Sequence, residues 1–248
     1  MKFNRLSSAF APLAALAIAA ALSGCDEAKV RIDGMEGKPL SELDMSGEPP
    51  RALALYGPDE VNIREGAKLA ITVEGDRDAA EQLRFSLRNG TLGIGRVTDS
   101  PASGIAIVNV VMPPPGKITA AGSGKVRAET LARDAEITVA GSGDVETKSV
   151  AADRLKITIA GSGIYRAGGT ATELDLNVAG SGDARMEGLK AGNATIRIAG
   201  SGRSSFASDG QVTANIIGSG EVKVRGRATC KVNSTGSGRL VCEAGDAA

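Results

Sequence analysis

The sequence predicts an all-β protein whose body winds as a parallel β-helix, a solenoid of coils about 19 residues long. The first observation is a repeat, because the triplet Gly-Ser-Gly occurs seven times at intervals of 18 to 20 residues. The second is an alternation of apolar and polar residues around each triplet, which is typical of strands with one buried face. The third is composition: 33 glycines, two tyrosines, four phenylalanines and no tryptophan do not suit a helix-rich globular enzyme.

Each triplet is interpreted as a corner between two strands, because glycine tolerates positive φ and allows a sharp turn of the backbone. The serines of the triplets are therefore expected to be structural, and they are Ser123, Ser142, Ser162, Ser181, Ser201, Ser219 and Ser237. Inward-facing residues are expected seven, five and three places before each serine and three and five places after it. Around Ser181 these positions are Leu174, Leu176, Val178, Ala184 and Met186.

The outward positions predict how the coils stack. Stacked parallel strands place equivalent residues about 4.8 Å apart, where opposite charges attract each other and like charges repel. Six places before the serines, the charge alternates through Lys117, Glu136, Lys156 and Asp175. Two places after the serines, no two consecutive coils carry like charges. These patterns predict an in-register parallel stack.

A different row, four places after each serine, is the candidate ligand-binding surface. Its cations, Arg127, Arg166, Arg185 and Lys223, are hypothesised to form a basic stripe that contacts polysaccharide carboxylates or lipid phosphates. Arg166 and Arg185 would be like charges on adjacent coils, which is unfavourable unless an anion or solvent lies between them. The alternative interpretation is a set of solvated arginines beside Glu146.

The N-terminus carries an export signal. Lys2 and Arg5 precede an apolar run from Ala11 to Leu22, as in a signal peptide, and the alternative is a retained membrane anchor. The junction Leu22-Ser23-Gly24-Cys25 resembles the lipobox of bacterial lipoproteins, which implies cleavage after residue 24 and lipid attachment to Cys25. Residues 1–24 are thus expected to be a lipoprotein signal peptide, and 25–50, rich in Gly, Pro and charge, a flexible tether. The membrane is the expected partner of the lipid.

The two remaining cysteines, Cys230 and Cys242, fall at inward positions of the last coil. In an oxidising compartment they would form a disulfide that closes this coil. The alternative is a pair of separate buried thiols.

Several kinds of chemistry are disfavoured. There is no histidine, which excludes histidine-based catalytic triads and imidazole-bound metals. Lys plus Arg and Asp plus Glu are both 29, so the net charge does not indicate nucleic-acid binding. Gly-Ser-Gly-Asp at Asp144 and Asp183 weakly resembles a calcium repeat, but calcium needs acidic ligands on successive coils. We expect no metal, no cofactor and no catalytic residues.

Residues 51–245 are expected to form one domain, with an N-terminal β section at 51–115 and a seven-coil β-helix at 116–245. The upstream section has short strand candidates at 52–55, 61–63, 69–73 and 105–112. Asn89-Gly90 between alternating apolar residues predicts a hairpin, and 76–83 could form one or two helical turns.

The order of several short motifs resembles one known family. These are Tyr56-Gly-Pro-Asp-Glu-Val-Asn-Ile-Arg-Glu-Gly66, then Ile71-Thr-Val-Glu-Gly-Asp76, then Asn89-Gly-Thr-Leu92, then the Ala-Gly-Ser-Gly corners. Over residues 50 to 243 the chain is similar to the GIN domain, also known as an auto-transporter adhesin head domain. The resemblance implies a right-handed parallel β-helix in exported, often lipid-anchored bacterial proteins, and it supplies no catalytic residues.

Three functions follow from these expectations. The leading hypothesis is a non-enzymatic, lipid-anchored envelope protein for adhesion, which binds polysaccharide or another envelope component. The second is a polysaccharide lyase or hydrolase, since β-helices and carboxylate pairs serve such enzymes without histidine. The third is a structural spacer of the envelope. The oligomeric state is left open.

Overall fold

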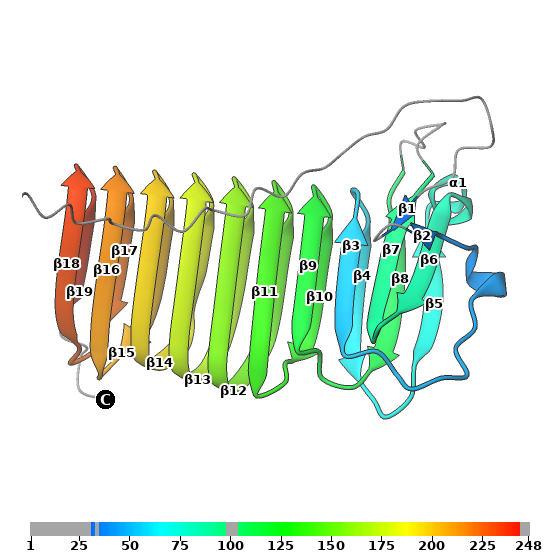
Figure 1. Ribbon diagram of the computed structural model, residues 1–248, viewed down its shortest axis with the longest axis horizontal. Helices are drawn as coiled ribbons and strands as arrows, with labels where there is room; N and C mark the ends of the chain where they lie inside the picture. Colours follow the sequence, from blue (N-terminus) through cyan, green and yellow to red (C-terminus); the bar gives the residue numbers. More distant parts are fainter. Residues whose placement is uncertain (1–30, 33–34, 98–103, 244–248) are drawn as a thin grey trace, which may run out of the picture.

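The computed structural model describes residues 31–32, 35–97 and 104–243, and it shows a long β-solenoid with an irregular section at one end (Figure 1). About seven turns, roughly 19 residues apart, form the regular part, which confirms the predicted fold class. The right-handed sense of winding stays a prediction. The strands of the regular part are β9 (Lys117–Gly122), β10 (Lys125–Thr130), β11 (Asp134–Gly141), β12 (Asp144–Gly161), β13 (Ile164–Gly180), β14 (Asp183–Gly200), β15 (Arg203–Ser208), β16 (Gln211–Gly218), β17 (Glu221–Arg225), β18 (Thr229–Gly236) and β19 (Arg239–Glu243).

The regular part has two long faces made of parallel strands. One face pairs β9, β11, the C-terminal halves of β12, β13 and β14, then β16 and β18. The other face pairs β10, the N-terminal halves of β12, β13 and β14, then β15, β17 and β19. The strands β12, β13 and β14 run through the bend between the two faces without a break. Each coil therefore hydrogen-bonds only to its two neighbours, as expected of a solenoid.

The Gly-Ser-Gly triplets are corners, as predicted. The first glycine of every triplet has a φ between 112° and 129°, a conformation that residues with a side chain rarely adopt. At five corners the serine N–H donates a 2.9 Å hydrogen bond to the first glycine's carbonyl oxygen one coil earlier. All seven serine side chains are exposed, so the corners depend on glycine and on the backbone of serine.

The strand register confirms the stacking predicted from the charges. Glu136 lies between Lys117 and Lys156 in the ladder, and its carboxylate forms ion pairs with both lysines. In the second row, Asp183 lies opposite Arg203, and Glu221 lies opposite Arg239. Both of these pairs form ion pairs as well.

The core is a tube of alternating large and small side chains. All ten inward positions predicted around Ser162 and Ser181 are buried. Tyr165 is fully buried in the row three places after the serines, and its hydroxyl bonds to Thr147 Oγ1 at 3.3 Å. The next two residues of that row are the small Ala184 and Ser204. On the same two coils, the row five places after the serines holds the large Met186 and Phe206, which are buried. The tube thus stays filled although single positions vary widely in volume.

The N-terminal section continues the stack before closing it. Its elements are β3 (Ala52–Tyr56), β4 (Glu60–Glu65), β5 (Ala70–Gly75), α1 (Arg77–Glu81), β6 (Leu83–Arg88), β7 (Thr91–Arg96) and β8 (Ala106–Met112). Strands β3 and β4 pair in parallel with β9 and β10, and they add a coil that lacks Gly-Ser-Gly. Strands β7 and β8 lie on the far side of β3 and β4. The antiparallel partners β5 and β6 then end the parallel stack, as the right-hand side of Figure 1 shows.

The local predictions for this section are confirmed. Strands β6 and β7 form the predicted hairpin, with positive φ at Asn89 and Gly90. Helix α1 begins after Asp76, whose side chain accepts a hydrogen bond from the Ala79 N–H.

A buried ion pair holds the section together. The carboxylate of Asp59 is completely buried, and it accepts hydrogen bonds from the Arg96 guanidinium and from the Ala106 N–H. The backbone oxygen of Asp59 also accepts a hydrogen bond from the Lys125 N–H, at the first residue of β10. Asp59 therefore links the start of β8 and the end of β7 to the regular coils.

Part of the segment 25–50, expected to be a flexible tether, packs on the domain. Lys38 exchanges two backbone hydrogen bonds with Phe85 of β6, at 2.8 and 2.7 Å. The short 3₁₀ helix η1 (Leu40–Glu42) follows, and Leu40 and Leu43 pack against the core. This segment is held because β6 offers a free backbone edge and the two leucines cover apolar surface. Two short strands, β1 (Arg31–Ile32) and β2 (Met35–Glu36), precede it, whereas residues 1–30, with the predicted signal peptide, lie outside the described residues.

Gly180→Ala should destabilise the protein by about 2 kcal/mol or more, because the residue would be held at positive φ. Its φ is 120°, and an added Cβ would lie 2.5 Å from the carbonyl oxygen of Gly161 on the adjacent coil. Urea denaturation followed by circular dichroism would measure the change. Gly168→Ala is the control, because its nearest atom would be 3.5 Å away, and it should cost less than about 1 kcal/mol. Equal losses would contradict this account of the corners.

Candidate binding surface

The residues of the predicted basic stripe lie in one row on the face that contains β10, β15, β17 and β19. The register places Arg127 next to Glu146, Glu146 next to Arg166, and Arg166 next to Arg185. Ser205, Lys223 and Val241 complete the row. The register therefore brings Arg127, Arg166, Arg185 and Lys223 into one row.

Each cation of the stripe has a carboxylate partner within the protein. Arg127 pairs with Glu60 and Glu146, Arg166 with Asp144, and Arg185 with Asp183. Lys223 lies 3.8 Å from Glu221. The neighbouring charges Arg166 and Arg185 are thus tolerated because each has its own aspartate in the adjacent outward row.

Beside this row, β14 bends at residues 186–189, which we call the ledge. Arg185 lies opposite Ser205 and Lys190 lies opposite Ala207, so β14 takes five steps where β15 takes two. The equivalent bends of β12 and β13 take five and four steps, so the coils become narrower at β15 and the ledge is the last wide bend. Met186 and Leu189 are fully buried, which anchors the ledge in the core.

Two hydrogen bonds connect the ledge to the next coils. The Ser205 hydroxyl donates to Glu187 Oε1, and Arg225 Nη2 donates to the carbonyl oxygen of Glu187 at 2.7 Å. Arg225 belongs to β17, which lies one coil beyond β15. The ledge is thus held over the coils that follow it.

A shallow depression of about 340 Å³ lies beside the ledge. Its lining consists of Asp183, Ala184, Arg185, Glu187, Arg203, Ser204, Ser205, Glu221 and Lys223. Two stripe residues, Arg185 and Lys223, belong to it, whereas Arg127 and Arg166 do not. Arg203, Glu187 and Ser205 were not predicted as site residues. The signal in the sequence is the serine spacing, which falls from 20 residues before Ser201 to 18 after it.

Asp183 is the central carboxylate of the depression. Arg185 Nη2 donates to its Oδ2 at 2.9 Å, and Arg203 donates from Nε and Nη2 at 3.1 and 3.2 Å. Burial opposes ionisation of this carboxyl, but the hydrogen bonds from the two arginines outweigh burial, and the pKa of Asp183 is lowered. The pKa of Glu187 is also lowered, mainly by the hydrogen bond from Ser205. Both groups are therefore anions at neutral pH.

Beneath this site, the hydroxyl of Ser204 is buried without a hydrogen-bond partner among the described residues. Its position in the row between Ala184 and Val222 points it toward the apolar tube. The depression therefore has charged side chains at its surface, and beneath them lies a serine whose hydroxyl makes no hydrogen bond among the described residues.

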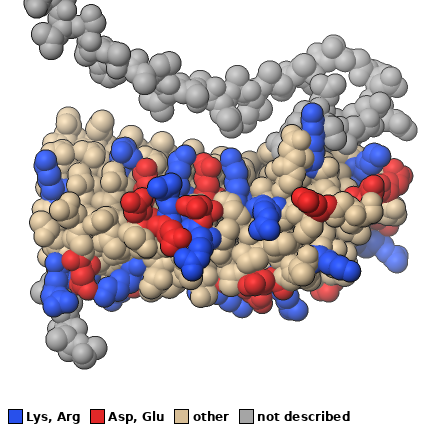
Figure 2. Space-filling model, turned by 60° about the horizontal axis from the view of Figure 1, so that its bottom comes forward, with Lys and Arg blue, Asp and Glu red and all other residues tan. Residues whose placement is uncertain are grey.

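Elsewhere on the exterior, charges of opposite sign lie side by side. Figure 2 shows positive and negative side chains interspersed over the middle of the rod. Ion pairs such as Arg133–Asp153, Arg154–Glu173 and Arg197–Asp175 contribute to this pattern. Exposed pairs of this kind add little stability each, so their main effect is to keep the surface free of large one-sign fields.

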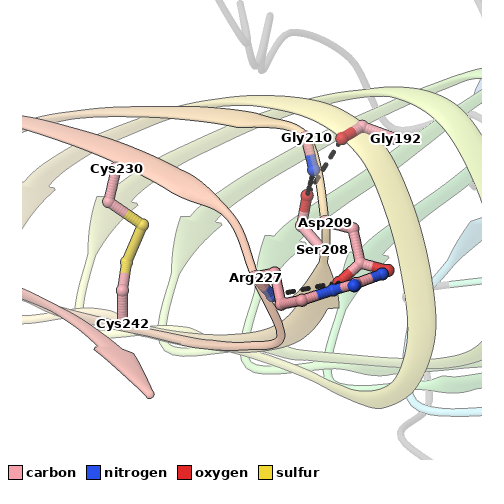
Figure 3. Close-up of a disulfide and its surroundings, with 7 residues drawn as sticks. All are labelled: Gly192, Ser208, Asp209, Gly210, Arg227, Cys230 and Cys242. Carbon is pink, nitrogen blue, oxygen red and sulfur yellow. Dashed lines mark hydrogen bonds and ion pairs between the residues drawn. A yellow bond between two sulfur atoms is a disulfide. The ribbon is translucent and has the colours of Figure 1, made fainter. Parts of the chain in front are cut away.

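The last coil contains a disulfide between Cys230 and Cys242, with Cα atoms 6.8 Å apart (Figure 3). The bond joins β18 to β19 across the end of the tube. The apolar Val232 on the same coil is 46% exposed, since no further coil covers it. Figure 3 also shows Ser208, at the end of β15. Its hydroxyl donates to the Gly192 carbonyl oxygen and accepts from the Gly210 N–H, which holds the bend between β15 and β16.

The described residues contain no cluster of three or more Asp, Glu, Cys or His side chains that could hold a metal ion. Among the same residues, no helix is long and apolar enough to span a membrane. The proposed lipidation site, Cys25, lies outside the described part of the chain.

The fold and the ion-paired exterior place this chain in the class of parallel β-solenoids with a regular, polar side. A sequence profile of the family described as "Putative auto-transporter adhesin, head GIN domain" matches residues 49–228. The chain therefore belongs to the GIN-domain family, as the sequence motifs indicated. A comparison with curated proteins finds no match.

Solved structures support the fold. The structure is similar to a "putative adhesin" from Bacteroides fragilis, with 17% identity and a TM-score of 0.69, covering 79% of this chain and 93% of that one. It is also similar to a "Putative lipid binding protein" from Parabacteroides distasonis, with 22% identity and a TM-score of 0.62, covering 79% and 93%. A "putative adhesin" from the same organism has 19% identity and a TM-score of 0.58, covering 80% and 93%. At these identities the likeness shows the fold.

Asp183→Asn should lower the free energy of unfolding by about 1 kcal/mol at pH 7, because two arginines lose their anion. The pKa of this carboxyl is lower in the folded state than the value of 3.8 in the unfolded state. Its contribution to the free energy of unfolding is therefore complete at pH values above 3.8, and it is lost as the pH falls through the folded-state pKa. The difference between wild type and variant should therefore shrink below pH 4. Urea denaturation at pH 7, 4 and 2.5 would measure it. Asp175→Asn, which removes a more exposed pair, should change stability by less than about 0.5 kcal/mol; a pH-independent Asp183 effect would contradict this account.

Proposed function

We propose that this chain is a non-enzymatic, lipid-anchored, adhesin-like protein of the bacterial cell envelope that binds polysaccharide or another envelope component along its side. The observation that carries the proposal is the in-register stack of coils, which repeats outward positions at a constant spacing along the rod. Such a surface matches a ligand that is itself long and repetitive. The family description and the names of the structural neighbours point in the same direction.

The geometry gives less support to an enzyme. The depression beside the ledge is shallow, and its three carboxylates are each ion-paired or hydrogen-bonded to neighbouring side chains. The pKa values of Asp183 and Glu187 are lowered, against the effect of burial, by hydrogen bonds from Arg185, Arg203 and Ser205, whereas a general acid in sugar hydrolysis needs a raised pKa. A lyase or hydrolase remains the alternative that product release would reveal.

A structural spacer is also less well supported. A spacer that contacts its partner end-on would favour a last coil with open apolar ends. Here the disulfide between Cys230 and Cys242 closes part of that end. Binding along the side is therefore the function that we propose.

Residues 26–248, produced without the lipid, should bind specific polysaccharides on a glycan array. A defined set of related glycans would support adhesion, because repeated outward rows contact repeated units. Incubation of the bound glycans with the protein, followed by mass spectrometry, should give no shortened products. Release of products would overturn the non-enzymatic assignment, and the absence of any glycan or envelope-component hit would overturn the binding function.

The lipid anchor has its own test. Cys25→Ser should move the protein from the membrane fraction to the soluble fraction of a bacterial host, because the sulfur that carries the lipid is lost. Incorporation of a labelled fatty acid should disappear in the same variant. Ser23→Ala is the control, since a small residue is kept at that position, and it should stay in the membrane fraction. Labelling of the Cys25→Ser variant would refute lipidation at this residue.

A further inference from the structure

The depression beside the ledge differs from the rest of the exterior in how its charges are exposed. The side chains of Arg203, Lys223 and Arg185 are 65%, 57% and 48% exposed. Their carboxylate partners Asp183 and Glu221 are only 11% and 18% exposed. An approaching ligand therefore meets these guanidinium and ammonium groups before it meets Asp183 or Glu221, whereas the third carboxylate of the depression, Glu187, is itself exposed on the ledge.

The lining of the depression holds equal numbers of opposite charges. Its cations are Arg185, Arg203 and Lys223, and its carboxylates are Asp183, Glu187 and Glu221. Two further arginines lie next to it: Arg225 donates to the Glu187 carbonyl oxygen, and Arg239 pairs with Glu221. Outside the depression, the stripe cations Arg127 and Arg166 are 35% and 37% exposed, and each contacts a carboxylate that is itself more accessible than Asp183. The depression is thus the part of this face best suited to an anion.

The cations also have a repeat. Arg185, Arg203 and Lys223 belong to three successive coils, because Arg185 lies opposite Ser205 and Ser205 lies opposite Lys223. Successive coils are about 4.8 Å apart, which is close to the advance of one sugar unit along an extended polysaccharide. Guanidinium groups keep free N–H donors after binding one carboxylate, and they suit planar carboxylates or sulfates.

The ledge supplies an edge for such a chain. Glu187 is fixed by Ser205 and by Arg225, so the ledge stays in place beside the row of cations. A polymer that runs along the rod would lie against this ledge as it crosses the three coils. We infer that the depression binds an acidic polysaccharide, whose carboxylate or sulfate groups contact Arg185, Arg203 and Lys223 on successive coils. This inference rests on the proposed binding function and names its site and ligand class.

The test compares two triple variants that carry the same change of charge. Arg185→Gln, Arg203→Gln and Lys223→Gln together remove the three cations of the depression. Arg133→Gln, Arg154→Gln and Lys156→Gln together remove two arginines and one lysine that are similarly exposed and ion-paired elsewhere. Binding of polygalacturonate, dextran sulfate and neutral dextran to each protein would be measured by isothermal titration calorimetry at two salt concentrations.

The depression variant should bind the acidic polymers at least about tenfold more weakly and with a smaller salt dependence, since ionic contacts are lost. The control variant should change affinity less than about twofold, and neutral dextran should not bind. Polygalacturonate and dextran sulfate separate carboxylate from sulfate recognition. The single variant Lys223→Gln, whose partner Glu221 keeps Arg239, should fold normally and weaken binding about threefold.

Several results would overturn the inference. Equal weakening in the two triple variants would show a non-specific charge effect, and unchanged binding in both would place the ligand elsewhere. Binding of neutral dextran as tight as that of the acidic polymers would refute the ligand class. If the wild type binds other glycans but neither acidic polymer, the depression assignment fails while the proposed function stands. If it binds no glycan or envelope component, both fail.

Discussion

The structure depends on the close approach of each backbone to its counterpart one coil away. At the corners, the first glycine of each triplet stacks on the carbonyl oxygen of the preceding one, and a Cβ there would be 2.2 to 2.5 Å from that oxygen in the coils after the first. Only glycine fits this spacing and this φ together. Because the corners are aligned, the strands between them are aligned too, and every outward and inward row follows. The corners therefore align the strands that flank them, whereas the shifts of register between coils lie at the opposite bend.

The alignment has opposite consequences inside and outside. Inside, stacking residues of equal size would leave gaps or clashes, and the tube instead compensates Tyr165 with the small Ala184 and Ser204 beyond it. Outside, stacking like charges would be unfavourable, and the rows place lysine or arginine beside aspartate or glutamate. Both patterns are solutions to one constraint, which is that equivalent residues of neighbouring coils are always in contact.

Departures from the repeat are where the surface acquires individual features. A constant coil produces a regular side that repeats the same outward positions along the rod. The coils become narrower after β14, which leaves the ledge as the last wide bend, and in the depression beside it Arg185, Arg203 and Lys223 are more exposed than Asp183 and Glu221. At the two ends the repeat stops in different ways, by antiparallel strands at β5 and β6 and by a disulfide at Cys230 and Cys242. The features that distinguish one coil from another therefore lie where the repeat changes or ends.

The sequence by itself determined the coil, its corners, its register and its buried rows, because all of these follow from a period that short-range alternation and glycine spacing make visible. It also identified the four cations of the stripe and the hairpin at Asn89-Gly90. Only the tertiary structure decided that β3 and β4 form a further coil, that Lys38 to Leu43 pack on the body, and that Arg203 and Glu187 join Arg185 and Lys223 in one depression. These features depend on how successive bends lie in space and on pairing between distant segments, which short-range alternation in the sequence does not display.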